Sequence, residues 1–221
     1  MKKLINSILL LATVITGQAQ KKDWAGHSRY EQANANLEQT PAVVFMGNSI
    51  TEGWVEKHPE FFTDNNYAGR GISGQVTSQM LCRMRSDVID LHPKAVVILA
   101  GTNDIALNNG QITVEHIFQN IVSMVELSRA NKIKVVLCSV LPAKKYGWRR
   151  DVDPVQPIME LNGLLEKYAK EKKLPWVDFY TPMVTGDGAL NPAYTRDGVH
   201  PTAEGYEVME SIIAPVLKRF K

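Results

Sequence analysis

The chain has 221 residues, of which 44% are hydrophobic, and this suits one globular domain with a substantial core. Its 25 lysine and arginine residues nearly balance its 23 aspartate and glutamate residues. The even charge gives no reason to expect a nucleic acid or an anionic membrane as a partner, and two cysteines are too few for a disulfide scaffold.

The first 19 residues have the layout of a secretory signal peptide. Two lysines follow the initial methionine, residues 4–16 are largely apolar, and Gly17 and Ala19 place small side chains before a cleavage after residue 19. The alternative is a retained N-terminal anchor, but the apolar run is too short to span a bilayer comfortably, so no stable membrane anchoring is expected. We therefore predict export to a periplasm or the extracellular space, with residues 20–221 forming one domain. Cleavage would remove two of the 25 basic residues, so the mature protein would have 23 basic and 23 acidic side chains and would be formally neutral.

Short apolar runs alternate with longer amphipathic ones along the rest of the chain. The apolar runs predict β-strands over residues 42–47, 66–68, 95–101, 133–140 and 176–179, the second being the weakest. Helical spacing of apolar residues predicts helices over residues 24–37, 76–91, 113–130, 155–173 and 203–220. This alternation indicates βαβ units, and nearly continuous apolar strands are typical of a sheet covered on both faces. We predict a three-layer α/β/α fold with a five-stranded parallel sheet in the flavodoxin-like order 2-1-3-4-5.

The two cysteines both lie in apolar stretches. Cys82 stands in the sequence MLCRM and Cys138 in VVLCSV. We predict two buried free thiols, with a single bridge between them as the alternative in an exported protein.

Parallel sheets place their functional sites at the carboxyl ends of the strands, and the first predicted strand runs into a serine. The sequence GNSIT occupies residues 47–51, so Ser49 lies between a buried strand and a following helix. A hydroxyl and a backbone N–H held there face the site, and the helix N-terminus favours negative charge nearby. The alternative is that Ser49 is an ordinary helix N-cap.

The next two strand ends supply hydrogen-bond donors. The glycine-rich sequence RGISG at residues 70–74 lets backbone amides approach a ligand closely, because glycine has no Cβ. The sequence AGTND at residues 100–104 contains Asn103, whose side chain donates to an oxyanion, which a carboxylate cannot do. Common glycine turns and Asx turns are the alternatives for these two segments.

A possible acid–base pair lies near the C-terminus, in the sequence TRDGVHP at residues 195–201. A serine hydroxyl needs an adjacent base, and the histidine pKa lies near working pH, so His200 fits that role. Asp197, three residues earlier across a turn, accepts from the imidazole and fixes its tautomer. Pro201 is predicted in the first turn of the helix that follows. Taken alone, this segment is more typical of a surface turn that caps a helix, and only together with the other strand ends does it predict the acid–base half of a triad.

Four blocks in order, GNSIT, GISG, GTND and DGVH, resemble the SGNH (GDSL-type) hydrolase family from about residue 42 onward. The resemblance implies a five-stranded parallel sheet between helices. It also implies that Ser49 is the nucleophile, His200 the base and Asp197 its orienting partner. The N–H groups of Ser49 and Gly74 and the side chain of Asn103 would form the oxyanion hole. No metal or other cofactor is expected, since the remaining histidines show no ligand spacing.

The chain departs from the family at Asn48, where aspartate usually precedes the serine. The exchange preserves shape but removes a charge beside the nucleophile. We include Asn48 among the predicted substrate contacts, because asparagine in place of aspartate at this position would suit a subgroup of the family with its own substrate.

The loop over residues 141–157 and the segment before Asp197 carry aromatic and arginine side chains, which suit sugars through stacking and hydrogen bonding. The predicted substrate contacts are Asn48, Tyr146, Trp148, Arg149 and Tyr194. No wide apolar groove for long acyl chains is evident in the sequence. We therefore predict a secreted serine esterase for short acyl groups, mainly acetyl, on a small-molecule or carbohydrate ester.

Several alternatives remain open at the level of the sequence. The same triad serves lipid-directed enzymes, such as lysophospholipases, thioesterases and enzymes similar to platelet-activating-factor acetylhydrolase. It also serves peptide or amide hydrolysis. A non-catalytic carbohydrate-binding protein on the same scaffold is a further possibility, encouraged by Asn48 alone, and the loop residues are also compatible with a plain exposed loop.

Overall fold

The computed structural model describes residues 23–220, and the predicted signal peptide lies outside these residues. Five strands form one parallel sheet: β1 (Val43–Gly47), β2 (Tyr67–Gly71), β3 (Ala95–Leu99), β4 (Lys134–Cys138) and β5 (Trp176–Val177). Their order is β2-β1-β3-β4-β5, and every pair of neighbours is parallel. The fold class and the strand order predicted from the sequence are therefore confirmed.

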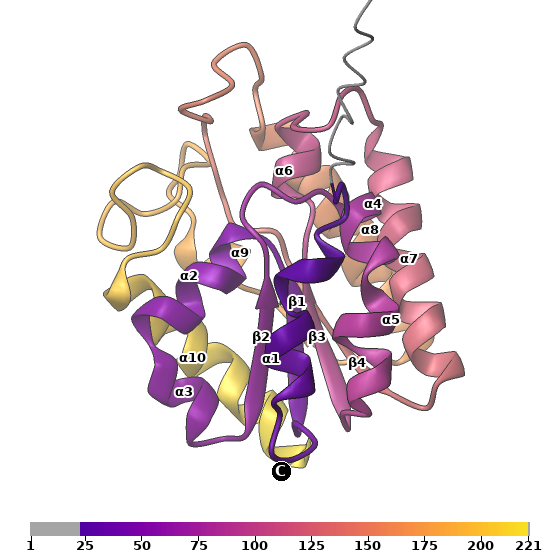
Figure 1. Cartoon of the computed structure of the whole chain (residues 1–221). Helices are drawn as coiled ribbons and strands as arrows, with labels where there is room; N and C mark the ends of the chain where they lie inside the picture. Colours follow the sequence, from indigo (N-terminus) through magenta and orange to yellow (C-terminus); the bar gives the residue numbers. More distant parts are fainter. Residues whose placement is uncertain (1–22, 221) are drawn as a thin grey trace, which may run out of the picture.

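Alternate residues of each strand enter two different cores, as the two-residue period of a strand requires. In β1, Val44 and Met46 belong to one core, and Val43 and Phe45 belong to the other. The first core is covered by α4 (Thr77–Cys82), α5 (Met84–Asp87), α7 (Val114–Ala130) and α8 (Val155–Lys172). The second is covered by α2 (Ser49–Lys57), α3 (Pro59–Thr63) and α10 (Ala203–Leu217). Figure 1 shows these two groups of helices on opposite sides of the sheet.

Short elements complete the chain: η1 (His27–Arg29), α1 (Glu31–Ala35), η2 (Ile89–Leu91), α6 (Thr102–Ile105), α9 (Tyr180–Met183) and η3 (Lys218–Phe220). Within residues 23–220, no helix combines the length and the apolar character needed to cross a membrane.

Helices α2 and α10 are locked together by an aromatic pair. The rings of Trp54 and Tyr206 stack with centroids 5.6 Å apart, and the Tyr206 hydroxyl donates to the carbonyl of Ile50 at 2.8 Å. Both side chains are fully buried. Because α2 begins at Ser49 and α10 follows His200 closely, this contact fixes the two functional segments relative to each other.

The single helix predicted over residues 76–91 is wrong, because the structure divides this segment into α4, α5 and η2. The breaks fall at Arg83 and at Val88, which have non-helical backbone angles. The Arg83 side chain is completely buried, and its guanidinium donates to the carbonyl of Gly47 at 3.0 Å. The charged Arg83 side chain thus points inward beneath the end of β1, at the residue where the helix is broken.

Two further helices were predicted with N-terminal ends that differ from those in the structure. The helix predicted over residues 24–37 is limited to η1 and α1, because Gly26 has a left-handed backbone with φ of 70°. Pro201 is not in the first turn of α10. It pairs with Thr195 in an isolated β-bridge, and Thr202 is the N-cap of the helix.

Cys82 and Cys138 are both free, as predicted, but Cys82 is exposed. It lies two residues from both Met80 and Met84, which face the core, so it points away from that core. Cys138 is buried in β4, and burial raises the pKa of its thiol.

Candidate active site

Ser49 is presented at the junction between β1 and α2. The N-cap of α2 is Asn48, whose side-chain oxygen accepts from the N–H of Ile50 at 3.0 Å. The N-cap role considered for Ser49 therefore belongs to its neighbour, and the Ser49 hydroxyl is left for other partners. Asn48 is 1% exposed, so this residue shapes the turn and does not present a surface for substrate, contrary to its prediction as a substrate contact.

Glycine at position 71 allows β2 to approach this junction closely. A Cβ atom there would lie 2.3 Å from the N atom of Glu52 and 2.6 Å from the carbonyl oxygen of Asn48. The strand register pairs Gly47 with both Gly71 and Leu99. The carboxyl ends of β2 and β3 therefore lie on either side of the turn that carries Ser49.

Ser49, His200 and Asp197 form a continuous hydrogen-bonded chain. The Ser49 Oγ lies 2.9 Å from His200 Nε2, although 151 residues separate them in sequence, and His200 Nδ1 lies 2.7 Å from Asp197 Oδ2. The other oxygen of Asp197 accepts from the N–H groups of Val199 at 2.9 Å and His200 at 2.8 Å. The turn of residues 197–200 therefore holds its carboxylate and imidazole in one orientation.

The Asp197 carboxylate, at the end of this hydrogen-bonded chain, is ionised at neutral pH. Partial burial raises the pKa of Asp197, but hydrogen bonds from the His200 side chain and from the N–H groups of His200 and Val199 outweigh it and lower the pKa to about 2. An ionised carboxylate accepts a hydrogen bond from Nδ1–H, so the tautomer inferred for His200 has Nε2 free to accept from the Ser49 hydroxyl.

Three predicted oxyanion donors converge on the same edge of the sheet. Gly74 has a left-handed backbone with φ of 78°, which glycine adopts without strain. Within residues 23–220, no hydrogen bond uses the N–H of Gly74 or that of Ser49. The Asn103 side chain donates to the carbonyl of Gln75 at 3.0 Å, and its second N–H remains free for another acceptor.

Asp104 connects the segment that carries Asn103 to the start of α4. Its carboxylate accepts from the N–H of Thr77 at 3.0 Å and from the Thr77 hydroxyl at 2.6 Å. Burial raises the pKa of Asp104 to about 6, in opposition to these hydrogen bonds, which lower it. Asp104 is thus a buried group that holds the two oxyanion segments together.

The raised pKa of Asp104 predicts a specific pH dependence of stability. Between about pH 4 and pH 6 the native state binds more protons than the unfolded state, so this group's contribution to stability falls as pH rises. Asp104→Asn has the same shape and does not titrate. We expect the free energy of unfolding of the variant, relative to wild type, to rise between pH 4 and pH 7 by about 3 kcal/mol at most. Urea unfolding of both proteins at the two pH values measures this, and a difference independent of pH would contradict it.

Residues 45–208 match the model of the GDSL-like Lipase/Acylhydrolase family. The chain belongs to this family. A GDSL-like lipase from Bacteroides thetaiotaomicron is 54% identical, with a TM-score of 0.86, and the match covers 88% of this chain and 98% of the other. A candidate acylhydrolase from Bacteroides fragilis is 53% identical, with a TM-score of 0.88, covering 91% of this chain and 100% of the other. The lipoprotein YqeF of Bacillus subtilis is 35% identical over 165 residues, 63% of this chain and 68% of the relative.

In this member of the GDSL-like family, the loop after β4 places Trp148 beside His200. The rings of the two residues lie 6.2 Å apart, and Trp148 is 45% exposed. Its indole N–H donates to the side-chain oxygen of Asn108 at 2.9 Å. Arg149 donates to the carbonyl of Leu107 at 3.1 Å, so the loop is tied to the turn after α6 at two adjacent positions.

Two other predicted substrate contacts are fully or partly buried. Tyr146 is fully buried, and its hydroxyl is hydrogen-bonded to Thr102 at 3.0 Å. Its ring lies 5.1 Å from that of Trp148, so it supports Trp148 and is not itself a surface for substrate. Tyr194 is partly buried and packs against the core beside α10.

Trp24 also belongs to this region, although it was not among the predicted substrate contacts. Trp24 is 44% exposed, and its indole N–H donates to the side chain of Asn109 at 3.4 Å. The adjacent Asn108 holds Trp148 and also donates to the carbonyl of Gly74 at 3.4 Å. Two exposed tryptophans are thus anchored on neighbouring asparagines beside the oxyanion turn. No local pattern signals this contact, because 85 residues separate Trp24 from Asn109.

The contacts that hold the glycine-rich turn were not predicted from the sequence either. The Glu52 carboxylate accepts from the N–H of Ser73 at 2.9 Å and from its hydroxyl, and Arg29 pairs with the same carboxylate at 2.9 Å. The Gln75 side chain donates to the carbonyl of Ala25 at 2.7 Å. The segment before β1 and the first turns of α2 therefore clamp the turn that carries Gly74.

Proposed function

We propose that this protein is a serine esterase that hydrolyses carboxylic esters, with Ser49 as the nucleophile. The observation that carries the proposal is the hydrogen-bonded chain from Ser49 through His200 to Asp197. A serine needs an adjacent base to become a nucleophile, and the base needs a third group to orient it. Membership of the GDSL-like Lipase/Acylhydrolase family supports ester bonds as the target.

The proposed reaction is acyl transfer in two steps. The Ser49 Oγ attacks the ester carbonyl while His200 Nε2 takes its proton, and His200 then protonates the leaving alcohol. His200 then takes a proton from water as the water attacks the acyl-enzyme, and it returns this proton to the leaving Ser49 Oγ, which releases the acid and restores the enzyme. The N–H groups of Ser49 and Gly74 and the Asn103 amide hold the oxyanion in both steps, and one such donor typically lowers the barrier by about 2.7–4 kcal/mol.

For the substrate, we propose short acyl groups, mainly acetyl, on carbohydrates. The groups available to a ligand beside the nucleophile are polar: the N–H groups of Ser49 and Gly74 and the side-chain amide of Asn103. A groove for a long acyl chain needs apolar walls, which these groups do not provide. The exposed rings of Trp148 and Trp24 offer flat apolar surfaces near the site, and such surfaces suit the faces of sugar rings.

We also propose that the protein is exported, on the basis of the predicted signal peptide over residues 1–19. The similarity to a bacterial lipoprotein supports export, because a lipoprotein is itself moved across the membrane. Intact mass measured on protein recovered from outside the cytoplasm should correspond to a chain that begins at Gln20. A full-length mass would overturn cleavage after residue 19, and recovery of the protein from the cytoplasm alone would overturn export.

Covalent labelling and an ester panel test the proposed function together. A fluorophosphonate probe should add one equivalent of mass, and peptide mapping should place it on Ser49. Initial rates should fall from p-nitrophenyl acetate to the butyrate and the octanoate. Rates that rise with chain length would overturn the preference for acetyl groups. Absence of both labelling and hydrolysis would favour a non-catalytic binding protein.

Trp148 is expected to contribute to the binding of a sugar and not to the chemistry. Trp148→Ala should raise KM for acetylated xylo-oligosaccharides about three- to tenfold, the equivalent of one lost aromatic contact. Hydrolysis of p-nitrophenyl acetate, which carries no sugar, should change less than twofold. Met159→Ala removes another exposed hydrophobic side chain, from α8, and should change neither value. Equal losses on both substrates in Trp148→Ala would show that the ring acts on His200 instead.

A further inference from the structure

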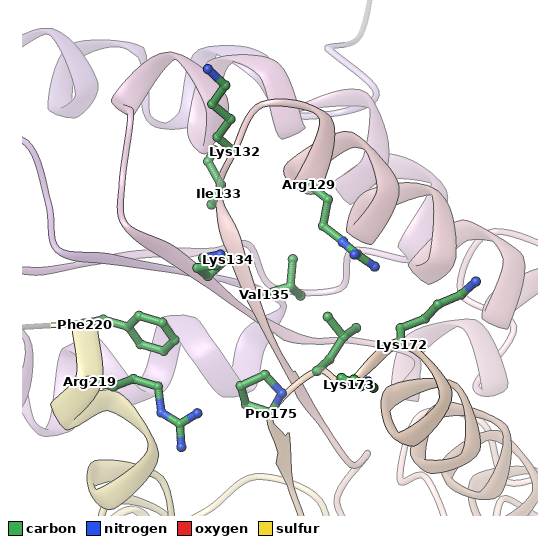
Figure 2. A pocket seen from close by; sticks show the side chains of 11 residues that line it. Arg129, Lys132, Ile133, Lys134, Val135, Lys172, Lys173, Pro175, Arg219 and Phe220 are labelled. Carbon is green, nitrogen blue, oxygen red and sulfur yellow. The ribbon is translucent and has the colours of Figure 1, made fainter.

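A pocket lies at the end of the sheet opposite the triad. Its volume is about 600 Å³, and it lies where β4 and β5 begin and where α7, α8 and η3 end. Figure 2 shows its lining side chains around the start of β4. Six of the eleven lining residues are cationic and none is acidic: Arg129, Lys132, Lys134, Lys172, Lys173 and Arg219.

The floor of this basic pocket is apolar. Ile133, Val135 and Phe220 line it and are buried, and Leu174 and Pro175 complete it. The six cationic residues are exposed at its rim. The pocket therefore combines a hydrophobic base with a ring of positive charge, a combination that matches an amphipathic anion.

Among the described residues, five of the six rim cations have no ion-pair or cation–π partner, and the sixth, Lys172, lies over the Tyr168 ring at 5.8 Å from its centroid. Within residues 23–220, none of the six takes part in a salt bridge, and none donates a hydrogen bond through its side chain. Like charges gathered in this way repel one another, and a bound anion relieves that repulsion. The concentration is local, because the whole chain has a formal net charge of only +2.

Helix termini explain only part of this cluster. Cations in the last turn of a helix interact favourably with its C-terminal dipole, which accounts for Arg129, Lys172 and Arg219. Lys132 and Lys173 lie beyond these turns, with left-handed φ values of 62° and 54°. Glycine or asparagine is usual where a helix ends in this conformation, because a side chain costs energy there. At both positions the chain has lysine instead.

We propose that the basic pocket is a binding site for a small amphipathic anion, a molecule with an apolar body and a phosphate or carboxylate group. Its volume lies within the range of about 300–1,000 Å³ typical of small-molecule sites. A concave pocket of this size suits a small molecule better than a flat membrane surface. The site is separate from Ser49, and the proposal does not depend on the esterase function.

Isothermal titration calorimetry with hexyl phosphate tests the site. We expect saturable 1:1 binding that weakens as salt is added. Inorganic phosphate should bind at least tenfold more weakly, because it lacks the apolar body, and hexanol should not bind. Absence of hexyl phosphate binding at millimolar concentration would overturn the proposal. Equal affinity for inorganic phosphate would overturn the role of the apolar floor.

Two double variants locate the binding. Lys134→Gln combined with Arg219→Gln removes two charges from the rim and should weaken hexyl phosphate binding at least tenfold. Lys167→Gln combined with Arg85→Gln removes one lysine and one arginine from exposed positions outside the pocket and should leave it unchanged. Circular dichroism melting establishes that both variants fold. Equal binding by both variants would place the ligand elsewhere. Binding of phosphatidylglycerol vesicles without binding of hexyl phosphate would replace the small ligand by a membrane surface.

Discussion

Replacement of Ser49 by alanine is expected to lower kcat for p-nitrophenyl acetate by at least ~10⁴-fold while leaving Tm nearly unchanged. The rate falls because the variant has no oxygen to form the acyl-enzyme, and His200 has no hydroxyl to deprotonate. Stability is retained because Asn48, not Ser49, caps α2 through the N–H of Ile50. Steady-state kinetics and thermal melting measure the two effects.

A matched control distinguishes loss of the nucleophile from general damage. Ser211 is an exposed serine on α10 whose hydroxyl donates only within its own helix, to the carbonyl of Val208. Ser211→Ala should keep the rate of wild type. Equal rates in wild type and Ser49→Ala would contradict the proposed mechanism, whether both are fast or both are slow. Activity retained in Ser49→Ala would further show that another residue performs the hydrolysis.

The sheet was predictable because each strand leaves a local signal. β1 and β3 are continuous apolar runs, since helices cover both of their faces. β2 gave a weak signal because it contains Gly69, Arg70 and Gly71. Arg70 stacks over Tyr30 with its guanidinium carbon 4.9 Å from the ring centroid, and this contact with a distant segment makes a charged residue compatible with a buried strand.

The broken helix after β2 was not predictable, because its cause is a tertiary contact. Met80 and Met84 recur at helical spacing through the break, so the hydrophobic pattern continues where the backbone does not. The break depends on Arg83, whose side chain bonds to Gly47, Gln75 and Asp87. Sequence patterns place a charged residue on the surface by default, and they do not reveal a buried network that satisfies it.

The candidate site also has a part that was predictable from the sequence and a part that was not. Ser49, Asn103 and the turn of Asp197 and His200 each follow a recognisable element end, so motif order was enough to predict that they meet. The surroundings depend on contacts between loops, and an aromatic residue in a loop carries no local signal for its exposure. For this reason Tyr146 was predicted at the surface but is buried, whereas Trp24 was missed although it is exposed.

Asp197→Asn is expected to lower kcat by about 10⁴-fold, close to the effect of losing the nucleophile. An asparagine keeps an oxygen able to accept from the N–H groups of Val199 and His200, so the turn should fold as before. Its NH₂ group then faces His200 Nδ1 and donates to it. The imidazole must place its proton on Nε2 instead, and Nε2 is no longer able to accept from Ser49.

The lowered pKa of Asp197 sets the pH range of this effect. With a pKa of about 2, the carboxylate stays ionised at any pH above about 4, so the variant should be impaired throughout that range. The same shift favours the native state above about pH 4, and this contribution is lost as pH falls toward 2. Asp187→Asn is the matched control, because this exposed aspartate pairs with Lys144 on the same side of the fold and has no contact with His200. It should keep the rate of wild type.

The combination of the two substitutions tests whether Ser49 and Asp197 act as one unit. Asp197 works only by orienting His200 toward the Ser49 hydroxyl, so once that hydroxyl is absent its loss has nothing further to remove. The double variant Ser49→Ala with Asp197→Asn should therefore be about as slow as Ser49→Ala alone, and not slower by a further 10⁴-fold. Additive losses would show that Asp197 supports hydrolysis by a route that does not pass through Ser49. A loss below tenfold in Asp197→Asn alone, with Ser49→Ala inactive, would show that another contact orients His200.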